Sequence, residues 1–185
     1  MRWLIWLLTA VLVIAGWCDL TDRCEARKGA GSRKMTITST AFVNGGMIPP
    51  KYTADGANVS PPLAFSGVPA GTKTLALICD DPDAPHRTWV HWVLFNLPAR
   101  VTRLPENVPP LPKLPSGALQ GRNDFGKIGY GGPAPPSGTH RYFFKVYAVD
   151  TVLSLEPGAT KDRLLKAMDG HILAQGELVG RYSRR

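Results

Sequence analysis

Short apolar runs, separated by turns rich in glycine and proline, dominate the sequence from residue 35 onward. Alternation of apolar and polar residues at a period of two is typical of a strand with one buried face. An unbroken apolar run is typical of a strand covered on both sides. The segments that we predict to be strands are residues 36–43, 63–65, 73–79, 88–97, 140–149 and 171–182. The pattern therefore predicts a mainly β domain.

One predicted strand carries a histidine between large apolar side chains. At a period of two, His91 shares a face with Val93 and Phe95. Val90 and Trp92 then share the opposite face. A core histidine with a satisfied hydrogen bond is the simplest interpretation, but the carboxylates just before this strand favour a functional role.

A single helix is expected near residues 160–170. Thr160 can cap its N-terminus, Leu164 and Met168 supply an apolar side, and Gly170 suits the turn that ends it. Residues 98–118 form a long proline-rich loop. We favour an ordered surface crossing there, with a proline-rich ligand for a protein partner as the alternative.

The N-terminal part of the chain does not share the strand pattern. Residues 1–17 are a signal-like hydrophobic segment, shorter than the roughly 20 residues that cross a bilayer. Residues 18–34 are expected to be a polar linker, and residues 35–185 the folded domain. This division favours export to the periplasm or the medium; if translation starts at Met35, the protein would be cytoplasmic.

Composition and charge narrow the class of protein. Hydrophobic residues make up 44% of the chain, which is typical of a globular domain, and 17 prolines with 19 glycines indicate many turns. The net charge of +8 comes from scattered basic residues, so the sequence does not predict a nucleic-acid-binding face. A basic surface of this kind would attract an anionic small molecule or a lipid headgroup.

Three carboxylates follow the apolar run of residues 73–79, in the sequence Asp80-Asp81-Pro82-Asp83-Ala84-Pro85. Because proline fixes its own backbone and restricts the residue before it, Asp81 and Asp83 are held stiffly at the end of a strand. Further along, His140 and Tyr142 lie on one face of a strand and can point into the same space.

These motifs together resemble the phosphatidylethanolamine-binding protein family, in particular its bacterial Raf-kinase-inhibitor-like branch. The resemblance covers residues 35–183. It is carried by the carboxylate motif at 80–85, by His91-Trp92, and by the motifs at residues 123–126, 129–133 and 138–142.

The resemblance implies a β-sandwich of antiparallel sheets with one or two short helices and a small anion pocket. It implies that the ligand-binding residues are Asp81, Asp83, His91, Gly132, Pro133, His140 and Tyr142. In such a pocket, carboxylates beside the two histidines would favour charged imidazolium rings that donate to a phosphate. The N–H groups of Gly131 and Gly132 would add neutral donors.

The function that we predict is non-catalytic binding of a phosphate-type anion or a phospholipid headgroup, without a metal or cofactor. One alternative is an interaction protein that inhibits a kinase or protease through its surface. A hydrolase that uses a metal or acid–base chemistry is the other, although the sequence has no short-spaced metal motif. The sequence does not determine the oligomeric state, and a homodimer is one of the options.

Overall fold

The computed structural model describes residues 33–184. Its helices are the 3₁₀ turn η1 (Pro50–Tyr52) and α2 (Lys161–Met168). Its strands are β1 (Arg33–Lys34), β2 (Thr36–Thr38), β3 (Leu63–Ser66), β4 (Thr74–Asp81), β5 (Trp89–Pro98), β6 (Arg103–Leu104), β7 (Leu119–Gln120), β8 (Thr139–Val149) and β9 (Ile172–Ser183). The signal-like segment 1–17 and most of the linker 18–34 lie outside the described residues. The last two residues of that linker form β1.

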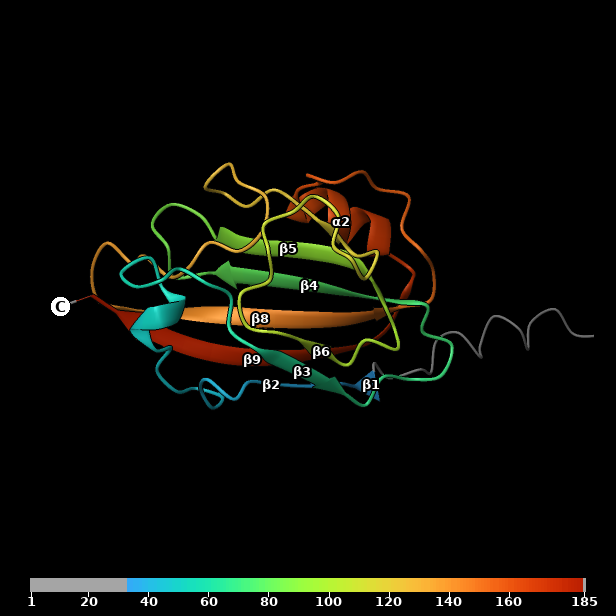
Figure 1. Cartoon of the computed structure of the whole chain (residues 1–185), viewed down its shortest axis with the longest axis horizontal. Helices are drawn as coiled ribbons and strands as arrows, with labels where there is room; N and C mark the ends of the chain where they lie inside the picture. The colour runs from blue at the N-terminus through green and yellow to red at the C-terminus, as the bar shows by residue number, and fades with distance from the viewer. Residues whose placement is uncertain (1–32, 185) are drawn as a thin grey trace, which may run out of the picture. The chain divides into compact units, whose positions relative to one another are not determined.

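The larger sheet has six strands in the order β1-β9-β8-β4-β5-β7 (Figure 1). Neighbouring strands are antiparallel except for β1, which runs parallel to β9. All eight residues of β4 are buried, as the apolar run predicted for a strand covered on both sides. The carboxylates at the end of β4 are therefore fixed by the centre of the fold.

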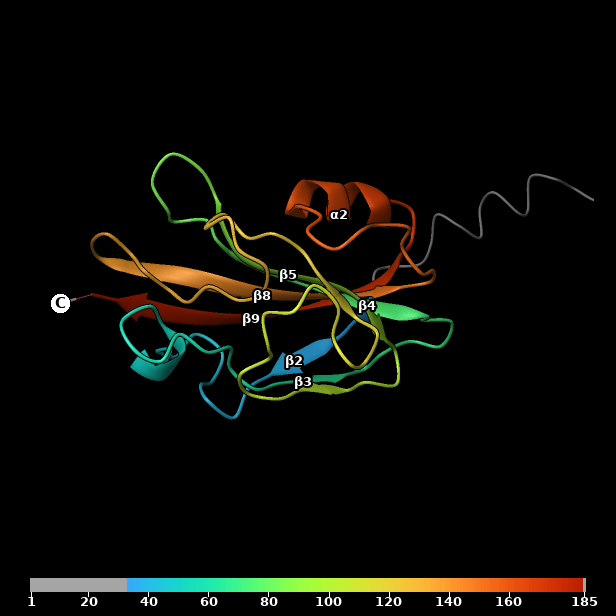
Figure 2. The same cartoon turned by 45° about the horizontal axis from the view of Figure 1, so that its top comes forward.

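A smaller antiparallel sheet, β2-β3-β6, covers one face of the larger sheet. In Figure 2 this sheet lies on one side of β8 and β9, and α2 lies on the other. The core between the two sheets contains Trp92 and Phe144 from the larger sheet and Ile37 and Phe65 from the smaller one. This burial of apolar surface is the main stabilising contribution to the sandwich.

The opposite face of the larger sheet packs against α2. Ile78 and Phe95 of the sheet form a second apolar cluster together with Leu164 and Met168 of the helix. The Thr160 side chain accepts a hydrogen bond from the N–H of Arg163, so it caps the helix as predicted. The predicted fold class, mainly β with antiparallel sheets and a short helix, is confirmed.

A β-bulge in β5 changes the orientation of His91. Cys79 pairs with Trp92, but the next residue of β4, Asp80, pairs with Val90, so His91 is an extra residue in β5. Val90 consequently lies in the same cluster as Val93 and Phe95 on the α2 side. His91 instead packs against Tyr142, on the side of the smaller sheet. The prediction that His91 shares a face with Val93 and Phe95 was wrong because a bulge breaks the alternation.

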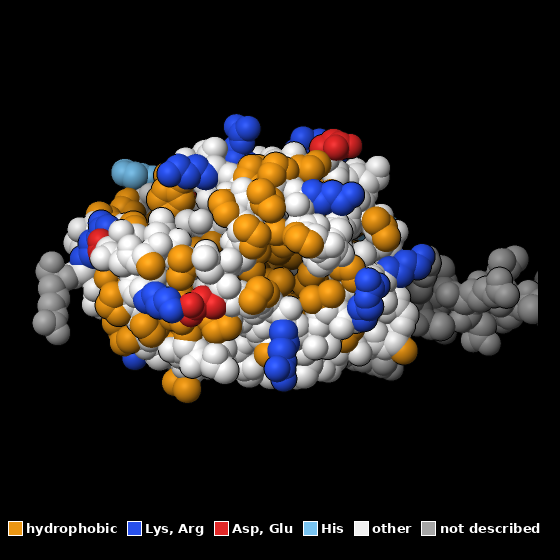
Figure 3. All heavy atoms as spheres, viewed as in Figure 1, with side chains coloured by type: hydrophobic (Ala, Val, Ile, Leu, Met, Phe, Trp, Pro, Cys, Tyr) orange, Lys and Arg blue, Asp and Glu red, His pale blue; other side chains and the backbone are white. Residues whose placement is uncertain are grey.

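The surface of the domain matches the scattered charge of the sequence. On the face shown in Figure 3, Lys and Arg side chains are spread around an apolar centre and form no continuous stripe. Within residues 33–184, none of the helices has the length and apolar character needed to cross a bilayer.

Candidate functional site

A cavity of about 220 Å³ lies where β4 ends and where β5 and β8 begin. It is smaller than the roughly 300–1,000 Å³ typical of pockets for drug-sized ligands, so it suits a small chemical group. Its walls are formed by Asp81, Ala84, Pro85, Trp89, His91, Phe125, Ala134, Pro135, Pro136 and His140. The structure therefore brings three of the predicted site residues, Asp81, His91 and His140, into one cavity.

Asp81 and His140 form a buried pair. The Nδ1 atom of His140 lies 2.7 Å from Oδ2 of Asp81, and both side chains are less than a tenth exposed. The other oxygen of Asp81 accepts the N–H of Asp83 at 2.8 Å. Because a carboxylate only accepts, Nδ1 of His140 carries a hydrogen, and Nε2 is the atom left to meet a ligand.

Asp83 does not line the cavity. Its Oδ2 accepts the backbone N–H and the Nε–H of Arg141, each at 2.9 Å, and its Oδ1 accepts from Nη2 at 2.7 Å. These bonds lower the pKa of Asp83 to about 2, against the opposing effect of partial burial. Asp83 thus holds the loop after β4 against β8, beside His140, instead of facing a ligand.

His91 has a neutral partner. Its Nδ1 lies 2.6 Å from the carbonyl oxygen of Gly131, and its ring packs edge-on against Phe125 and Tyr142, with centroids 5.4 and 5.1 Å away. Burial lowers the pKa of His91, although the Gly131 carbonyl and nearby carboxylates act in the opposite direction. Desolvation therefore outweighs the nearby carboxylates and disfavours the charged imidazolium expected at His91.

Gly132 and Pro133 lie beside the cavity wall but not on it. The Gly132 N–H donates to Oδ1 of Asn58 at 2.7 Å, and the Pro133 carbonyl accepts from Ala54. The Gly131 N–H donates to the carbonyl of His91. The glycine N–H groups expected to bind an anion are thus occupied within the protein, and the wall itself is formed by residues 134–136.

Tyr142 lies directly behind His91. It is fully buried, and its hydroxyl has no partner within hydrogen-bonding distance among the described residues. Burial and the Asp81 carboxylate raise the pKa of Tyr142, and the backbone of Ala134 acts in the opposite direction. The hydroxyl therefore keeps its hydrogen and lies behind the cavity wall, to which Ala134 belongs.

The sequence prediction missed Trp89 and Phe125. Trp89 lines the cavity, and its indole Nε1–H is buried without a partner. The Arg87 guanidinium lies 5.0 Å above the Trp89 ring and contacts Asp124 at 3.1 Å. Trp89 could have been found from its position two residues before His91 at the start of the same strand.

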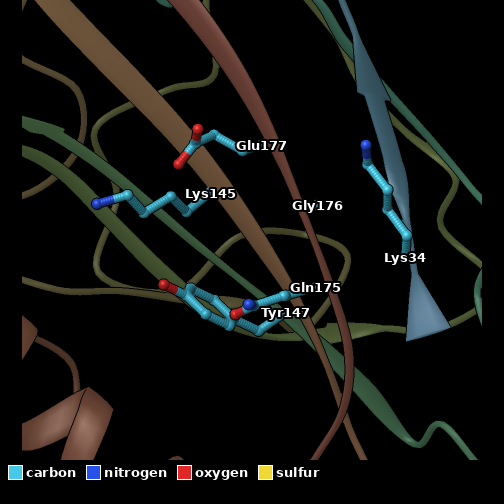
Figure 4. A pocket seen from close by; sticks show the side chains of 6 residues that line it. All are labelled: Lys34, Lys145, Tyr147, Gln175, Gly176 and Glu177. Carbon is cyan, nitrogen blue, oxygen red and sulfur yellow. The ribbon is translucent and has the colours of Figure 1, made fainter. Parts of the chain in front are cut away.

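A larger hollow of about 550 Å³ lies on the α2 side of the sheet. Figure 4 shows Lys145 of β8 extending away from Lys34; across the two strands Glu177 of β9 pairs with Lys145, and Gln175 pairs with Tyr147. Lys145 already donates to the buried carboxylate of Asp80, at 2.9 Å. Because its central basic group is paired inside the protein, we place the candidate site in the smaller cavity.

Comparison with known proteins identifies the family. A sequence model of the family "Phosphatidylethanolamine-binding protein" matches residues 38–183. The chain belongs to the phosphatidylethanolamine-binding protein family. A UPF0098 protein of Methanothermobacter thermautotrophicus is 57% identical over 150 residues, which cover 81% of this chain and 99% of the relative.

Two solved structures of this family resemble the present one. The crystal structure of a phosphatidylethanolamine-binding protein homologue from Chlamydia trachomatis has a TM-score of 0.76 and 46% identity, and the match covers 83% of this chain and 100% of that one. The structure of E. coli YbcL has a TM-score of 0.76 and 36% identity, with 82% and 99% covered. The family predicted from the sequence motifs is confirmed.

The residues of the cavity also bear on the chemistry that this family member can perform. Within residues 33–184, no group of three or more His, Cys, Asp or Glu side chains is arranged to hold a metal ion. The lining contains an Asp–His pair and a second histidine but no serine, threonine or cysteine side chain. The absence of a metal and of a cofactor stays a prediction.

Proposed function

We propose that the protein is a non-catalytic binding protein whose cavity takes a phosphate-type anion or a phospholipid headgroup. The observation that carries the proposal is a buried Asp–His pair whose imidazole lines a small, largely apolar cavity. Nδ1 of His140 is bonded to Asp81 at 2.7 Å, and within residues 33–184 its Nε2 has no hydrogen-bond partner. A protonated ring would donate from Nε2 to an anion in the cavity.

The Asp81 carboxylate also fixes the orientation of the His140 ring, because it accepts from Nδ1 at 2.7 Å. The apolar walls, which include Trp89, Phe125 and Pro135, exclude water and strengthen this interaction. Membership of a family named for phosphatidylethanolamine binding supports the same ligand class.

A hydrolase is the second candidate, because a buried Asp–His pair is also what a general base requires. Water is then the simplest nucleophile, since the lining holds no serine, threonine or cysteine side chain. Turnover of a phosphatase and esterase panel that disappears in His140→Ala would favour this candidate over simple binding. Inhibition of a kinase or protease, and export through residues 1–17, stay predictions.

NMR titration of the four histidines with inorganic phosphate tests the proposal. His91 and His140 should shift saturably, since both line the cavity. His171 is the matched control, because it forms a similar pair with Asp150, at 2.8 Å, but is exposed and lies outside the cavity. Equal small shifts at all histidines up to millimolar phosphate would refute an anion site.

A further inference from the structure

The cavity wall formed by residues 134–136 makes few polar contacts of its own. Two of its three residues are prolines, which have no N–H to donate. Within residues 33–184, the wall makes no hydrogen bond to another backbone group. Its position is therefore set from its two ends: β8 begins at Thr139 on one side, and residues 130–133 precede the wall on the other.

The loop that contains η1 holds the residues before the wall. Three hydrogen bonds join residues 130–133 to this loop, at 2.7, 3.0 and 2.7 Å: Tyr130 hydroxyl to the Tyr52 carbonyl, Ala54 N–H to the Pro133 carbonyl, and Gly132 N–H to Oδ1 of Asn58. Asn58 makes its bond from a left-handed backbone conformation, with φ of 55°. The bonds lie directly before the wall, so a shift of the loop is passed on to the cavity.

On its other side the loop is bonded to the end of β9 through Asp55. Nε of Arg184 donates to Oδ2 of Asp55 at 2.9 Å, and Nη2 donates to Oδ1 at 2.7 Å. The Tyr182 hydroxyl donates to Oδ2 at 2.9 Å. These hydrogen bonds lower the pKa of Asp55, so the carboxylate stays ionised near neutral pH. A bidentate pair of this kind fixes the relative orientation of its two partners.

The tip of this loop, residues 54–58, has little else to fix it. All five residues are exposed, whereas Thr53 just before them is buried. An exposed ion pair contributes little to overall stability, so the effect of Arg184 is local. The tip carries Asp55 and also makes two of the three bonds to residues 130–133.

We infer that Arg184 and Asp55 are positioning residues for the cavity. Their bidentate pair fixes the loop tip, which holds residues 130–133 and, through them, the wall. The effect on a ligand rests on the proposed function, but the positioning itself needs no ligand. Without the pair, the wall would populate several arrangements, and the apparent affinity would fall with the fraction that is competent to bind.

The first test uses NMR on the protein without ligand. Arg184→Gln removes the charge and the fork of the guanidinium, at a side chain that is more than a third exposed. The backbone ¹⁵N–¹H signals of Gly132 and Ala134 should then shift or broaden. Ala134 is the informative probe, because it is the one residue of the wall that has an N–H.

Lys51→Gln is the matched control. Lys51 belongs to the same loop and forms a similarly exposed ion pair, with Glu106 at 2.6 Å, and the change removes the same charge. Glu106 bonds Lys51 and Tyr52 but makes no hydrogen bond to residues 130–136. The Ala134 signal should therefore stay in place. An Ala134 signal that is unchanged in Arg184→Gln as well would overturn the inference.

The second test measures the affinity for inorganic phosphate by calorimetry. Arg184→Gln should bind phosphate about three- to fivefold more weakly than the wild-type protein, as expected if a fifth to a third of the molecules keep a competent wall. Lys51→Gln should bind within about 1.5-fold of the wild-type protein. Equal affinities of the two variants would overturn the inference.

A double variant shows whether the two residues act as a pair. Arg184→Gln and Asp55→Asn remove the same contact, so the protein that carries both should bind phosphate about as tightly as Arg184→Gln alone. Losses that multiply would show that the residues act separately and would contradict the inference. If the wild-type protein does not bind phosphate, the proposed function is refuted, and the Ala134 signal still decides whether Arg184 positions the wall.

Discussion

Asp80 and Asp81 are consecutive residues of β4, and their carboxylates lie on opposite faces of the same sheet. Asp80 bonds Lys145 and Lys161 on the α2 side, whereas Asp81 bonds His140 at the cavity. Successive side chains of a strand point to opposite faces, so one short motif serves two purposes. Asp80 connects the helix to the sheet, and Asp81 orients an imidazole of the site.

The first prediction concerns Asp80→Asn. Asp80 is fully buried and contacts two ammonium groups that are themselves only 31% and 21% exposed. Removing its charge leaves them without a partner, so the free energy of unfolding should fall by about 2–4 kcal/mol. Urea denaturation measures this loss, and phosphate affinity should change less than about twofold, since Asp80 does not face the cavity.

Asp150→Asn is the control for that experiment. Asp150 also has a side-chain partner, the His171 imidazole, but both side chains are more than two-fifths exposed. Exposed pairs contribute about 0–1 kcal/mol, so this change should be nearly neutral. An Asp80→Asn protein as stable as the control would show that the buried pair contributes nothing.

The second prediction concerns the pH dependence of stability through Asp83. Its pKa falls from an ordinary value of 3.8 to about 2 because of Arg141. A depressed pKa stabilises the folded state above the unfolded value, and that stability is lost as the pH falls from about 4 to about 2. Because Arg141 is 54% exposed, we expect a discounted contribution of about 1 kcal/mol.

Unfolding of the wild-type protein and of Asp83→Asn, followed by urea at several pH values, isolates this contribution. The stability difference between them should be constant above pH 5 and should shrink below pH 4. Asp169→Asn, at an exposed carboxylate after α2, is the control. A difference that stays constant down to pH 2 would show that Asp83 is not coupled to Arg141.

The third prediction compares two adjacent glycines. A Cβ at Gly132 would lie 2.8 Å from the Thr53 backbone and 2.7 Å from Oδ1 of Asn58, which cannot easily move. A Cβ at Gly131 would instead meet the ring of Phe125, at 2.7 Å, and that side chain is 41% exposed. Gly132→Ala should therefore lower the free energy of unfolding by about 2–4 kcal/mol, and Gly131→Ala by about 1 kcal/mol.

The two glycine variants also differ in their expected effect on the site. Gly131→Ala should displace Phe125 and alter phosphate affinity with little loss of stability, because Phe125 forms part of the cavity wall. Thermal unfolding and calorimetry on both proteins measure the two quantities separately. Equal stability of the two variants would contradict the packing described around Thr53.

The sequence predicted the strands well where burial decided the pattern. The unbroken run before Asp80 became β4, and the alternation at residues 140–149 became β8, with Tyr142 and Phe144 on one face. It failed for His91, because a bulge depends on how β5 pairs with β4 and not on the local pattern. The charge of His91 could not be predicted either, since desolvation depends on tertiary burial.

The wall of the cavity shows a second limit of sequence reasoning. Motif matching placed Gly132 and Pro133 at the ligand, but residues 134–136 line the cavity. A glycine-proline turn can present either of its sides to a neighbour. Here Oδ1 of Asn58 accepts a hydrogen bond from the Gly132 N–H. Only the fold brings Asn58 beside that turn, so its role was not visible in the sequence.

The last prediction separates binding from stability at Trp89. The indole N–H of Trp89 has no partner within residues 33–184, so Trp89→Phe should change the free energy of unfolding by less than about 1 kcal/mol. Trp89 forms part of the cavity wall and packs edge-on against Phe125, so the smaller ring should reshape the wall and lower phosphate affinity about five- to tenfold.

Trp92→Phe is the matched control, because Nε1 of Trp92 donates to Oε1 of Gln120 at 2.7 Å in the core. There the change leaves a buried acceptor without its donor and should cost about 1–3 kcal/mol of stability, with affinity nearly unchanged. Calorimetry measures the phosphate affinity of both variants, and urea denaturation measures their free energies of unfolding. If Trp89→Phe binds phosphate as tightly as the wild-type protein, the bound anion does not contact the wall at Trp89, and His140 would have to supply the contact.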